Sequence, residues 1–185
     1  MADEAASEAI TFGTDGWRGT LDEFTAPRLR MVGQAVGTYL SDVDAAGSVA
    51  VGYDARESSR GFAEEISRVL AANGRDITIA ERDCPTPVLA WTVKRGDYAG
   101  GLMITASHNP PEYNGVKFLP ESGSPALPAV TDAIEARLAP PDPVEETAYG
   151  SVRERDLVTP FSDHAMAFVD ADLDGLSIAY DAMHG

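Results

Sequence analysis

A hydroxyl, an imidazole and a carboxamide follow one another where an apolar segment of the chain ends. Residues 100–104 read Gly-Gly-Leu-Met-Ile, and they run into Thr-Ala-Ser-His-Asn-Pro at residues 105–110. In an open α/β sheet, ligands and reactive groups collect at the carboxyl ends of the strands. Lys117 follows ten residues beyond Ser107. These residue types indicate that Ser107 is a nucleophile or a carrier of a phosphoryl group.

Three interpretations of Ser107 differ in the residues that they use. A serine hydrolase places its nucleophile on a Gly-x-Ser-x-Gly elbow, whereas Ser107 stands between alanine and histidine. The base of a catalytic triad also usually comes from a distant part of the chain. In a purely structural interpretation, Ser107 and Asn109 satisfy backbone groups of a turn that precedes a proline. A phosphoryl-carrying serine is the interpretation that uses Arg18, His108 and Lys117 together.

A glycine-rich segment near the N-terminus is a candidate phosphate site. Residues 12–19 read Phe-Gly-Thr-Asp-Gly-Trp-Arg-Gly. This spacing lets backbone N–H groups surround an anion, and Arg18 can donate two parallel hydrogen bonds to phosphate. The segment is not a P-loop, because the Gly-Lys-Ser/Thr ending is absent. A plain glycine-rich turn before the first helix stays open as the alternative.

A second polar segment joins a predicted strand to a predicted helix. Residues 52–59 read Gly-Tyr-Asp-Ala-Arg-Glu-Ser-Ser, and Ser58 or Ser59 could cap the helix. Asp54 and Arg56 either order the neighbouring active-site loop or only stabilise the junction. We favour the structural role, with Arg56 as the residue expected to do more.

The dipeptide Asn114-Gly115 is typical of a hairpin turn. In the strand predicted after it, residues 116–119, Lys117 lies on the face opposite its two apolar neighbours. Lys117 is one of only two lysines in the chain, which favours a role in chemistry. An exposed strand lysine is nevertheless the common case, and this segment taken alone favours that interpretation.

Strand and helix patterns alternate along the first 140 residues. Strands are predicted at residues 49–53, 76–80, 100–106 and 116–119. Helices are predicted to begin near Pro27, Ser58, Pro87 and Pro128. Strands separated by helices indicate an α/β protein with a three-layer α/β/α sandwich.

The C-terminal part has a different pattern. Residues 139–146 are rich in proline and acidic residues, which is typical of a surface connection. A helix is predicted from Thr159, followed by a strand at residues 176–180 where a new α/β unit would begin. We therefore predict a domain over residues 1–140, a linker over residues 141–158, and the beginning of a truncated second domain over residues 159–185.

The composition excludes several classes of protein. The 185 residues include 14 basic and 30 acidic ones, which gives a formal charge of −16. An acidic, lysine-poor surface indicates either a halophile-like protein in a cytosol of high salt or simply a soluble acidic protein. The negative field argues against nucleic acid as a partner. A single cysteine, no signal-peptide pattern and no long apolar run predict a cytoplasmic protein without contact to a membrane.

Together these segments resemble the α-D-phosphohexomutases, the family that includes phosphoglucomutase and phosphomannomutase. The matching pieces occur in the family's order, at residues 12–19, 52–59, 84–87, 105–110 and 113–117. Residues 180–185 resemble the opening strand of the family's second domain, so the resemblance spans nearly the whole chain. It implies that the sheet of the first domain is mixed.

The resemblance also implies a mechanism. Ser107 would be a phosphoserine that donates its phosphoryl group to a hexose phosphate and regains one from a reoriented hexose bisphosphate. Phosphate thereby moves between the 1- and 6-positions of the sugar. Lys117 would be the general acid/base, and Arg18 and His108 would steady the phosphoryl group. The residues implied to bind phosphate or substrate are Thr14, Gly16, Arg18, Asn109 and Asn114.

In the family, Mg²⁺ binds an oxygen of the phosphoserine, here the phosphate on Ser107. The family's other metal ligands, in an Asp-Gly-Asp-x-Asp-Arg loop of the second domain, have no counterpart in these 185 residues and would lie beyond Gly185. The expected partners are therefore a phosphosugar substrate and the missing domains of the same protein. We expect the 185-residue chain to be inactive by itself.

Two kinds of alternative remain. Within the family, the alternative to a glucose or mannose enzyme is phosphoglucosamine mutase, which the Glu-Tyr pair before Asn114 slightly disfavours. From other classes, the alternatives are a non-catalytic remnant that binds a phosphosugar or a partner and, more distantly, a hydrolase that uses Ser107.

Overall fold

The computed structural model describes residues 10–13, 16–140, 150–169 and 174–181. The strands are β1 (Gly16–Thr20), β2 (Ser48–Tyr53), β3 (Ile77–Ala80), β4 (Tyr98–Ile104), β5 (Tyr113–Pro120) and β6 (Val152–Arg155). The helices are α2 (Ala26–Asp42), α3 (Ser59–Ala72), α4 (Thr86–Arg95), α5 (Pro128–Glu135) and α6 (Val158–Met166). Among these helices, none combines the length and apolar character that a membrane span requires.

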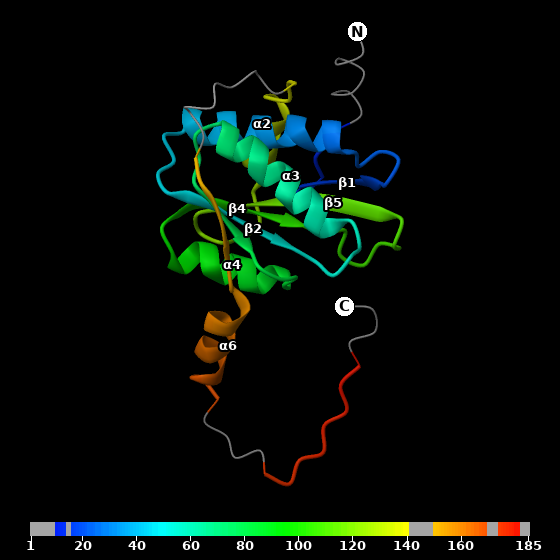
Figure 1. Ribbon diagram of the computed structural model, residues 1–185, viewed down its shortest axis with the longest axis vertical. Helices are drawn as coiled ribbons and strands as arrows, with labels where there is room; N and C mark the ends of the chain where they lie inside the picture. Colours follow the sequence, from blue (N-terminus) through cyan, green and yellow to red (C-terminus); the bar gives the residue numbers. More distant parts are fainter. Residues whose placement is uncertain (1–9, 14–15, 141–149, 170–173, 182–185) are drawn as a thin grey trace.

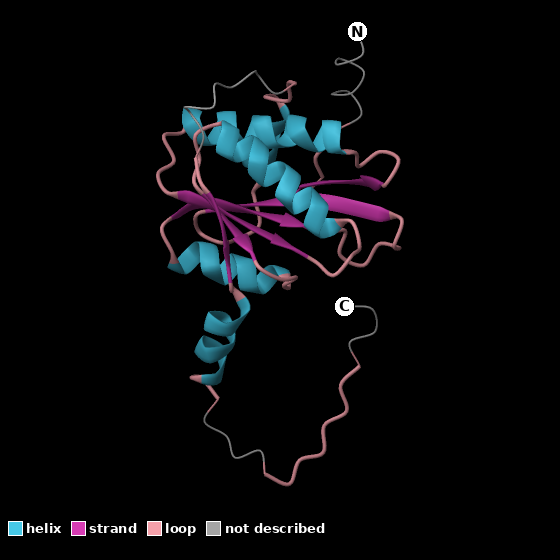
Figure 2. Ribbon diagram, in the orientation of Figure 1, coloured by secondary structure: helices cyan, strands magenta, loops and turns pink. Residues whose placement is uncertain are grey.

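One six-stranded sheet organises the molecule, in the order β1-β5-β4-β2-β3-β6. Strands β4, β2, β3 and β6 run parallel, whereas β5 is antiparallel to both of its neighbours, β4 and β1. The helices α2 and α3 cover one face and α4 covers the other (Figures 1 and 2). The predicted three-layer α/β/α sandwich with a mixed sheet is therefore confirmed.

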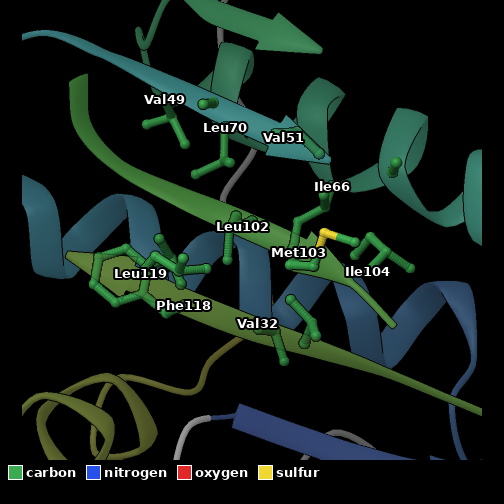
Figure 3. Packing of buried hydrophobic residues seen from close by; sticks show 14 of the residues in the cluster. Val32, Val49, Val51, Ile66, Leu70, Leu102, Met103, Ile104, Phe118 and Leu119 are labelled. Atoms are coloured by element: carbon green, nitrogen blue, oxygen red, sulfur yellow. The ribbon is translucent and has the colours of Figure 1, made fainter. Parts of the chain in front are cut away.

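The core lies mainly between the sheet and the pair α2 and α3. The central strands β2 and β4 are buried on both faces, as expected for parallel strands covered by helices. Figure 3 shows apolar side chains of the sheet packed with apolar side chains of both helices. The residues concerned include Val49, Val51, Leu102, Ile104 and Phe118 of the sheet and Val32, Ile66 and Leu70 of the helices.

The structure corrects the prediction of a hairpin turn at Asn114-Gly115. Both residues lie inside β5, where Asn114 pairs with Gly19 and Gly115 pairs with Arg18. The chain reverses earlier, in the loop of residues 105–112 between β4 and β5. Pairing with β1 thus overrides the local turn propensity of the dipeptide.

A strand also forms inside the segment predicted to be a linker. Strand β6 pairs with β3 at the edge of the sheet, and all four of its residues are exposed. The Asp76 carboxylate accepts hydrogen bonds from the backbone N–H and the hydroxyl of Ser151, at 2.7 and 2.8 Å. Because β6 carries no alternation of apolar and polar residues, the sequence contained no signal for it.

The predicted helix from Thr159 corresponds to α6, but the strand predicted at residues 176–180 is not formed. These five residues have no regular secondary structure and are exposed. A strand is stable only when a neighbouring strand pairs with its backbone groups. The apolar pattern alone therefore did not produce one here.

Candidate active site

The two predicted cations Arg18 and Lys117 lie on one face of the sheet. Arg18 pairs with Gly115, and Lys117 pairs with Gly16 across the β1–β5 ladder. Directly paired residues point to the same face, so Arg18 and Lys117 are diagonal neighbours. Lys117 also pairs with Met103 of β4. This is the α4 face, because a Cβ atom on Gly101, which is on the same side of β4 as Met103, would lie 2.7 Å from Cγ2 of Val93 in α4.

Two glycines allow these strands and side chains to approach closely. A Cβ atom on Gly115 would lie only 2.7 Å from Cγ of Arg18 and 2.8 Å from the carbonyl oxygen of Thr105. A Cβ atom on Gly16 would lie 2.0 Å from the carbonyl oxygen of Val116. The Arg18 side chain and the first residue of the 105–112 loop therefore pack together over Gly115. The tertiary structure in this way brings Arg18 to the loop that carries Ser107.

Ser107 occupies an unusual backbone conformation in that loop. Its φ is +56°, and among the described residues only Asp44 shares a positive φ without being glycine. This left-handed region costs an L-residue with a side chain roughly 1–2 kcal/mol. The Ser107 N–H donates to the Thr105 hydroxyl at 2.9 Å, and the Ser107 hydroxyl lies 3.4 Å from Nδ1 of His108. Such strain is typical of functional sites.

The guanidinium group of Arg56 holds the loop from the side of α3. It donates four hydrogen bonds to main-chain carbonyl oxygens and one, from Nε, to the Asp54 carboxylate at 3.2 Å. The four acceptors are the carbonyls of Ser107 (3.1 Å), Asn109 (2.6 Å), Pro110 (2.7 Å) and Tyr113 (3.1 Å). The structure thus links the segment around Asp54 to the Ser107 loop.

Asn114 belongs to a buried network and not to the exposed part of the site. Its amide nitrogen donates to the hydroxyls of Ser58 and Ser59, at 2.9 and 3.0 Å, and its oxygen accepts the Gly115 N–H at 2.8 Å. The Ser59 hydroxyl in turn donates to Asp54 at 2.6 Å. Asn114 is completely buried. A role of Asn114 in binding phosphate or substrate therefore stays a prediction. Ser58 is the N-cap residue of α3, but its side chain makes no capping hydrogen bond.

The remaining predicted residues differ in exposure. His108 and Arg18 are exposed, and Asn109 and Lys117 are half-buried. Thr14 lies outside the described residues. The phosphate-binding roles of these residues and of the closely packed Gly16 remain predictions.

The described residues do not form a metal centre by themselves. Within these ranges, no group of three or more His, Cys, Asp or Glu side chains is suited to a metal ion. Gly185, the residue beyond which the other metal ligands are expected, lies outside the described part of the chain. The role of Ser107 as a metal ligand through its phosphate, and the position of the other ligands beyond Gly185, therefore stay predictions.

Cys84 does not compete with Ser107 as a nucleophile. It is buried, and its backbone N–H donates to the carbonyl oxygen of Tyr53. Burial raises the pKa of the Cys84 thiol to about 11. Because the thiolate is the reactive form, this thiol is inert at neutral pH.

Comparison with known proteins gives one consistent result. Residues 9–144 match the family model described as phosphoglucomutase/phosphomannomutase, alpha/beta/alpha domain I. A phosphoglucosamine mutase of Synechococcus sp. (strain CC9311) is 37% identical over 181 residues, which cover 95% of this chain and 39% of that protein. A phosphoglucomutase of Komagataeibacter xylinus is 30% identical over 206 residues, which cover 97% of this chain and 37% of that protein.

A solved structure shares the fold. A Thermus thermophilus protein described as a phosphomannomutase superposes with a TM-score of 0.78 at 37% identity, over 88% of this chain and 36% of that one. The chain therefore spans less than two fifths of the length of these relatives.

Proposed function

Since the chain belongs to the phosphoglucomutase/phosphomannomutase family, we propose that it forms the phosphoserine part of a phosphohexomutase. The observation that supports this best is the placement of Ser107. It lies at the end of a central strand, in a strained loop that packs against Arg18. The reaction proposed for the whole protein moves a phosphoryl group between the 1- and 6-positions of a hexose phosphate.

In the proposed transfer, the phosphorylated Ser107 donates to a hydroxyl of the bound sugar phosphate. The bond between phosphorus and Oγ of Ser107 breaks, and a new bond forms between phosphorus and the sugar oxygen. Lys117, as general acid/base, takes the proton of that hydroxyl and passes it to the leaving Oγ of Ser107, and the proton takes the opposite route when the phosphoryl group returns to the serine. Because the transition state is loose, the cation of Arg18 and the imidazole of His108 mainly hold the moving phosphoryl oxygens.

Mg²⁺ would bind an oxygen of the phosphate on Ser107 and neutralise charge there. The Ser107 side chain is exposed, so a phosphate on it is accessible to an ion from outside. The remaining ligands are proposed to come from the family's Asp-Gly-Asp-x-Asp-Arg loop. The partners proposed are therefore a phosphosugar and the further domains of the same protein.

The identity of the sugar has two candidates. Glucose or mannose phosphate is consistent with relatives named phosphoglucomutase and phosphomannomutase. Glucosamine phosphate is favoured by the phosphoglucosamine mutase that matches 95% of this chain at 37% identity. Turnover of the full-length protein with the 1-phosphates of glucose, mannose and glucosamine separates the two.

The test of the phosphoserine is an intact-mass measurement after treatment with glucose 1,6-bisphosphate. We expect one phosphoryl group on the full-length protein, located on Ser107 by peptide mapping and absent from Ser107→Ala. A protein that stays unmodified would instead be a non-catalytic remnant, and an adduct on another residue would overturn the assignment of Ser107. The 185-residue chain is expected to show no mutase turnover by itself.

A further inference from the structure

Arg56 touches no reacting atom in the mechanism above, yet its side chain is fully engaged at the Ser107 loop. A guanidinium group has five N–H donors in a fixed plane. In Arg56, Nη1 donates to Pro110 and Tyr113, Nη2 donates to Ser107 and Asn109, and Nε donates to Asp54. All five donors are therefore used, and the side chain is only 16% exposed.

The four carbonyl groups bound by Arg56 come from both sides of the bend. The Ser107 and Asn109 carbonyls lie at the start of the loop, and the Tyr113 carbonyl belongs to the first residue of β5. One planar group thus ties the two ends of the loop together. A lysine ammonium, with three donors on a flexible stem, does not reproduce this planar arrangement.

The Asp54 carboxylate, which binds Arg56, is itself held by further hydrogen bonds. The Asp54 carboxylate accepts hydrogen bonds from the Arg56 backbone N–H and from Nε, both at 3.2 Å. Asp54 also accepts the Ser59 hydroxyl, which receives a hydrogen bond from the buried Asn114. The guanidinium group of Arg56 is therefore held by a hydrogen-bond network that includes residues of both α3 and β5.

Of these contacts, the hydrogen bond from Arg56 to the Ser107 carbonyl bears most directly on the proposed chemistry, because it constrains the backbone of the reactive serine. Ser107 holds a positive φ, which a residue with a side chain leaves unless its surroundings enforce it. The peptide group after Ser107 is fixed on its oxygen by Arg56, and the peptide group before it is fixed on its nitrogen by Thr105. Without the first of these contacts, Ser107 is free to relax toward negative φ and to turn its hydroxyl.

We propose that Arg56 is the positioning residue of Ser107: it holds the loop so that the Ser107 hydroxyl is presented for phosphoryl transfer. This inference rests on the proposed function. Its consequence is that loss of Arg56 slows transfer to and from Ser107, while binding of the sugar phosphate changes little. Misplacement of a reacting group by about 1 Å lowers a rate by about 10²-fold.

The experiment compares Arg56→Gln and Arg56→Lys with the control Arg60→Gln in the full-length protein. Arg60 lies in the first turn of α3 and bonds to Tyr53, Glu64, Glu81 and Glu154, away from the loop. The first readout is the rate at which glucose 1,6-bisphosphate phosphorylates Ser107 in a single turnover. We expect both Arg56 variants to be slower by about 10²-fold with little change in KM, and Arg60→Gln to match the unaltered protein.

The second readout is amide hydrogen exchange, which does not depend on activity. We expect faster exchange at residues 107–113 in both Arg56 variants and unchanged exchange in the central strands. Equal phosphorylation rates in all variants would overturn the proposal, and so would unchanged exchange in the loop. If the unaltered protein is not phosphorylated at all, the proposed function fails, and the exchange result alone decides whether Arg56 holds the loop.

Discussion

The two edges of the sheet are held in place by different physical means. At the β1–β5 edge, the strands approach over Gly16 and Gly115, and the buried Asn114 joins β5 to the start of α3. At the β6 edge, every strand residue is exposed, and one link to the body is the ion pair of Arg60 with Glu154 at 2.8 Å.

This difference shows what each edge does. Reactive groups require positions fixed to a fraction of an ångström, which close backbone contacts and satisfied buried hydrogen bonds provide. An exposed edge strand requires protection from pairing with other chains, which charged side chains provide. Substitutions at the first edge are therefore expected to affect activity and stability strongly, and those at the second edge weakly.

The largest expected effect is on catalysis at the β1–β5 edge. We expect Lys117→Met to lower kcat of the full-length protein by about 10²–10⁴-fold, because the sugar hydroxyl loses its general acid/base. The matched control is Lys94→Met, which removes the other lysine of the chain from an exposed position in α4. Steady-state turnover measures both, and an equal effect of the two variants would contradict the special position of Lys117.

The next effect is on stability at the same edge. We expect Gly115→Ala to lower the free energy of unfolding by about 1–3 kcal/mol, because the added methyl group meets backbone oxygens that cannot move independently. Gly61→Ala in α3 is the control, since nothing lies within 4 Å of its added Cβ atom. Urea unfolding of the control is expected to show equal or greater stability, by up to about 1 kcal/mol. Two equal losses would show that the close approach at Gly115 is not the cause.

A smaller effect is expected at the β6 edge when the solution is acidified. Ser151 lowers the pKa of Asp76 by hydrogen bonding, and Thr159 and Val158 do the same for Asp156 at the start of α6. A carboxylate with a lowered folded pKa stabilises the fold fully above its usual pKa of 3.8 and loses that contribution as the pH falls through the lowered value. The packing of β6 and α6 against the rest of the domain is therefore expected to weaken as the pH falls below 3.8.

The fluorescence of two tryptophans can follow the two regions separately, because Trp17 lies in β1 and Trp91 contacts α6, the helix that follows β6. Trp17 of β1 stacks on Phe24 at 4.6 Å, and Trp91 of α4 contacts Phe161 of α6 at 5.9 Å between ring centroids. In single-tryptophan variants, acid is expected to change the Trp91 fluorescence at a higher pH than the Trp17 fluorescence. Asp156→Asn is expected to remove part of this difference. A simultaneous change of both signals would show that the two edges unfold together.

The smallest effect is expected for Glu154→Gln on β6. The variant loses the exposed ion pair with Arg60, and such pairs contribute little to stability. Thermal unfolding and turnover are both expected to remain as in the unaltered protein. A clear loss of either would show that the β6 edge supports the site after all.

Much of the fold was accessible from local patterns. The buried strands and the amphipathic helices α2 and α3 were predicted because apolar periodicity reflects burial directly. Strand β6 was missed because its four residues are exposed, and its pairing depends on Ile77 and its neighbours, which lie 75 residues earlier. Asn114-Gly115 was misassigned because its pairing with β1 outweighs its local preference for a turn.

The sequence by itself determined the chemistry that is available: a serine in a loop after a strand, a cation on each of two segments, and the family to which the chain belongs. Only the tertiary structure decided how these groups are positioned. The contact of Arg18 with Gly115, the hydrogen bonds of the buried Asn114 and the four hydrogen bonds of Arg56 to loop carbonyls all join residues far apart in the chain. Such contacts have no local signal, because they depend on strand register and on backbone atoms, which every residue type carries.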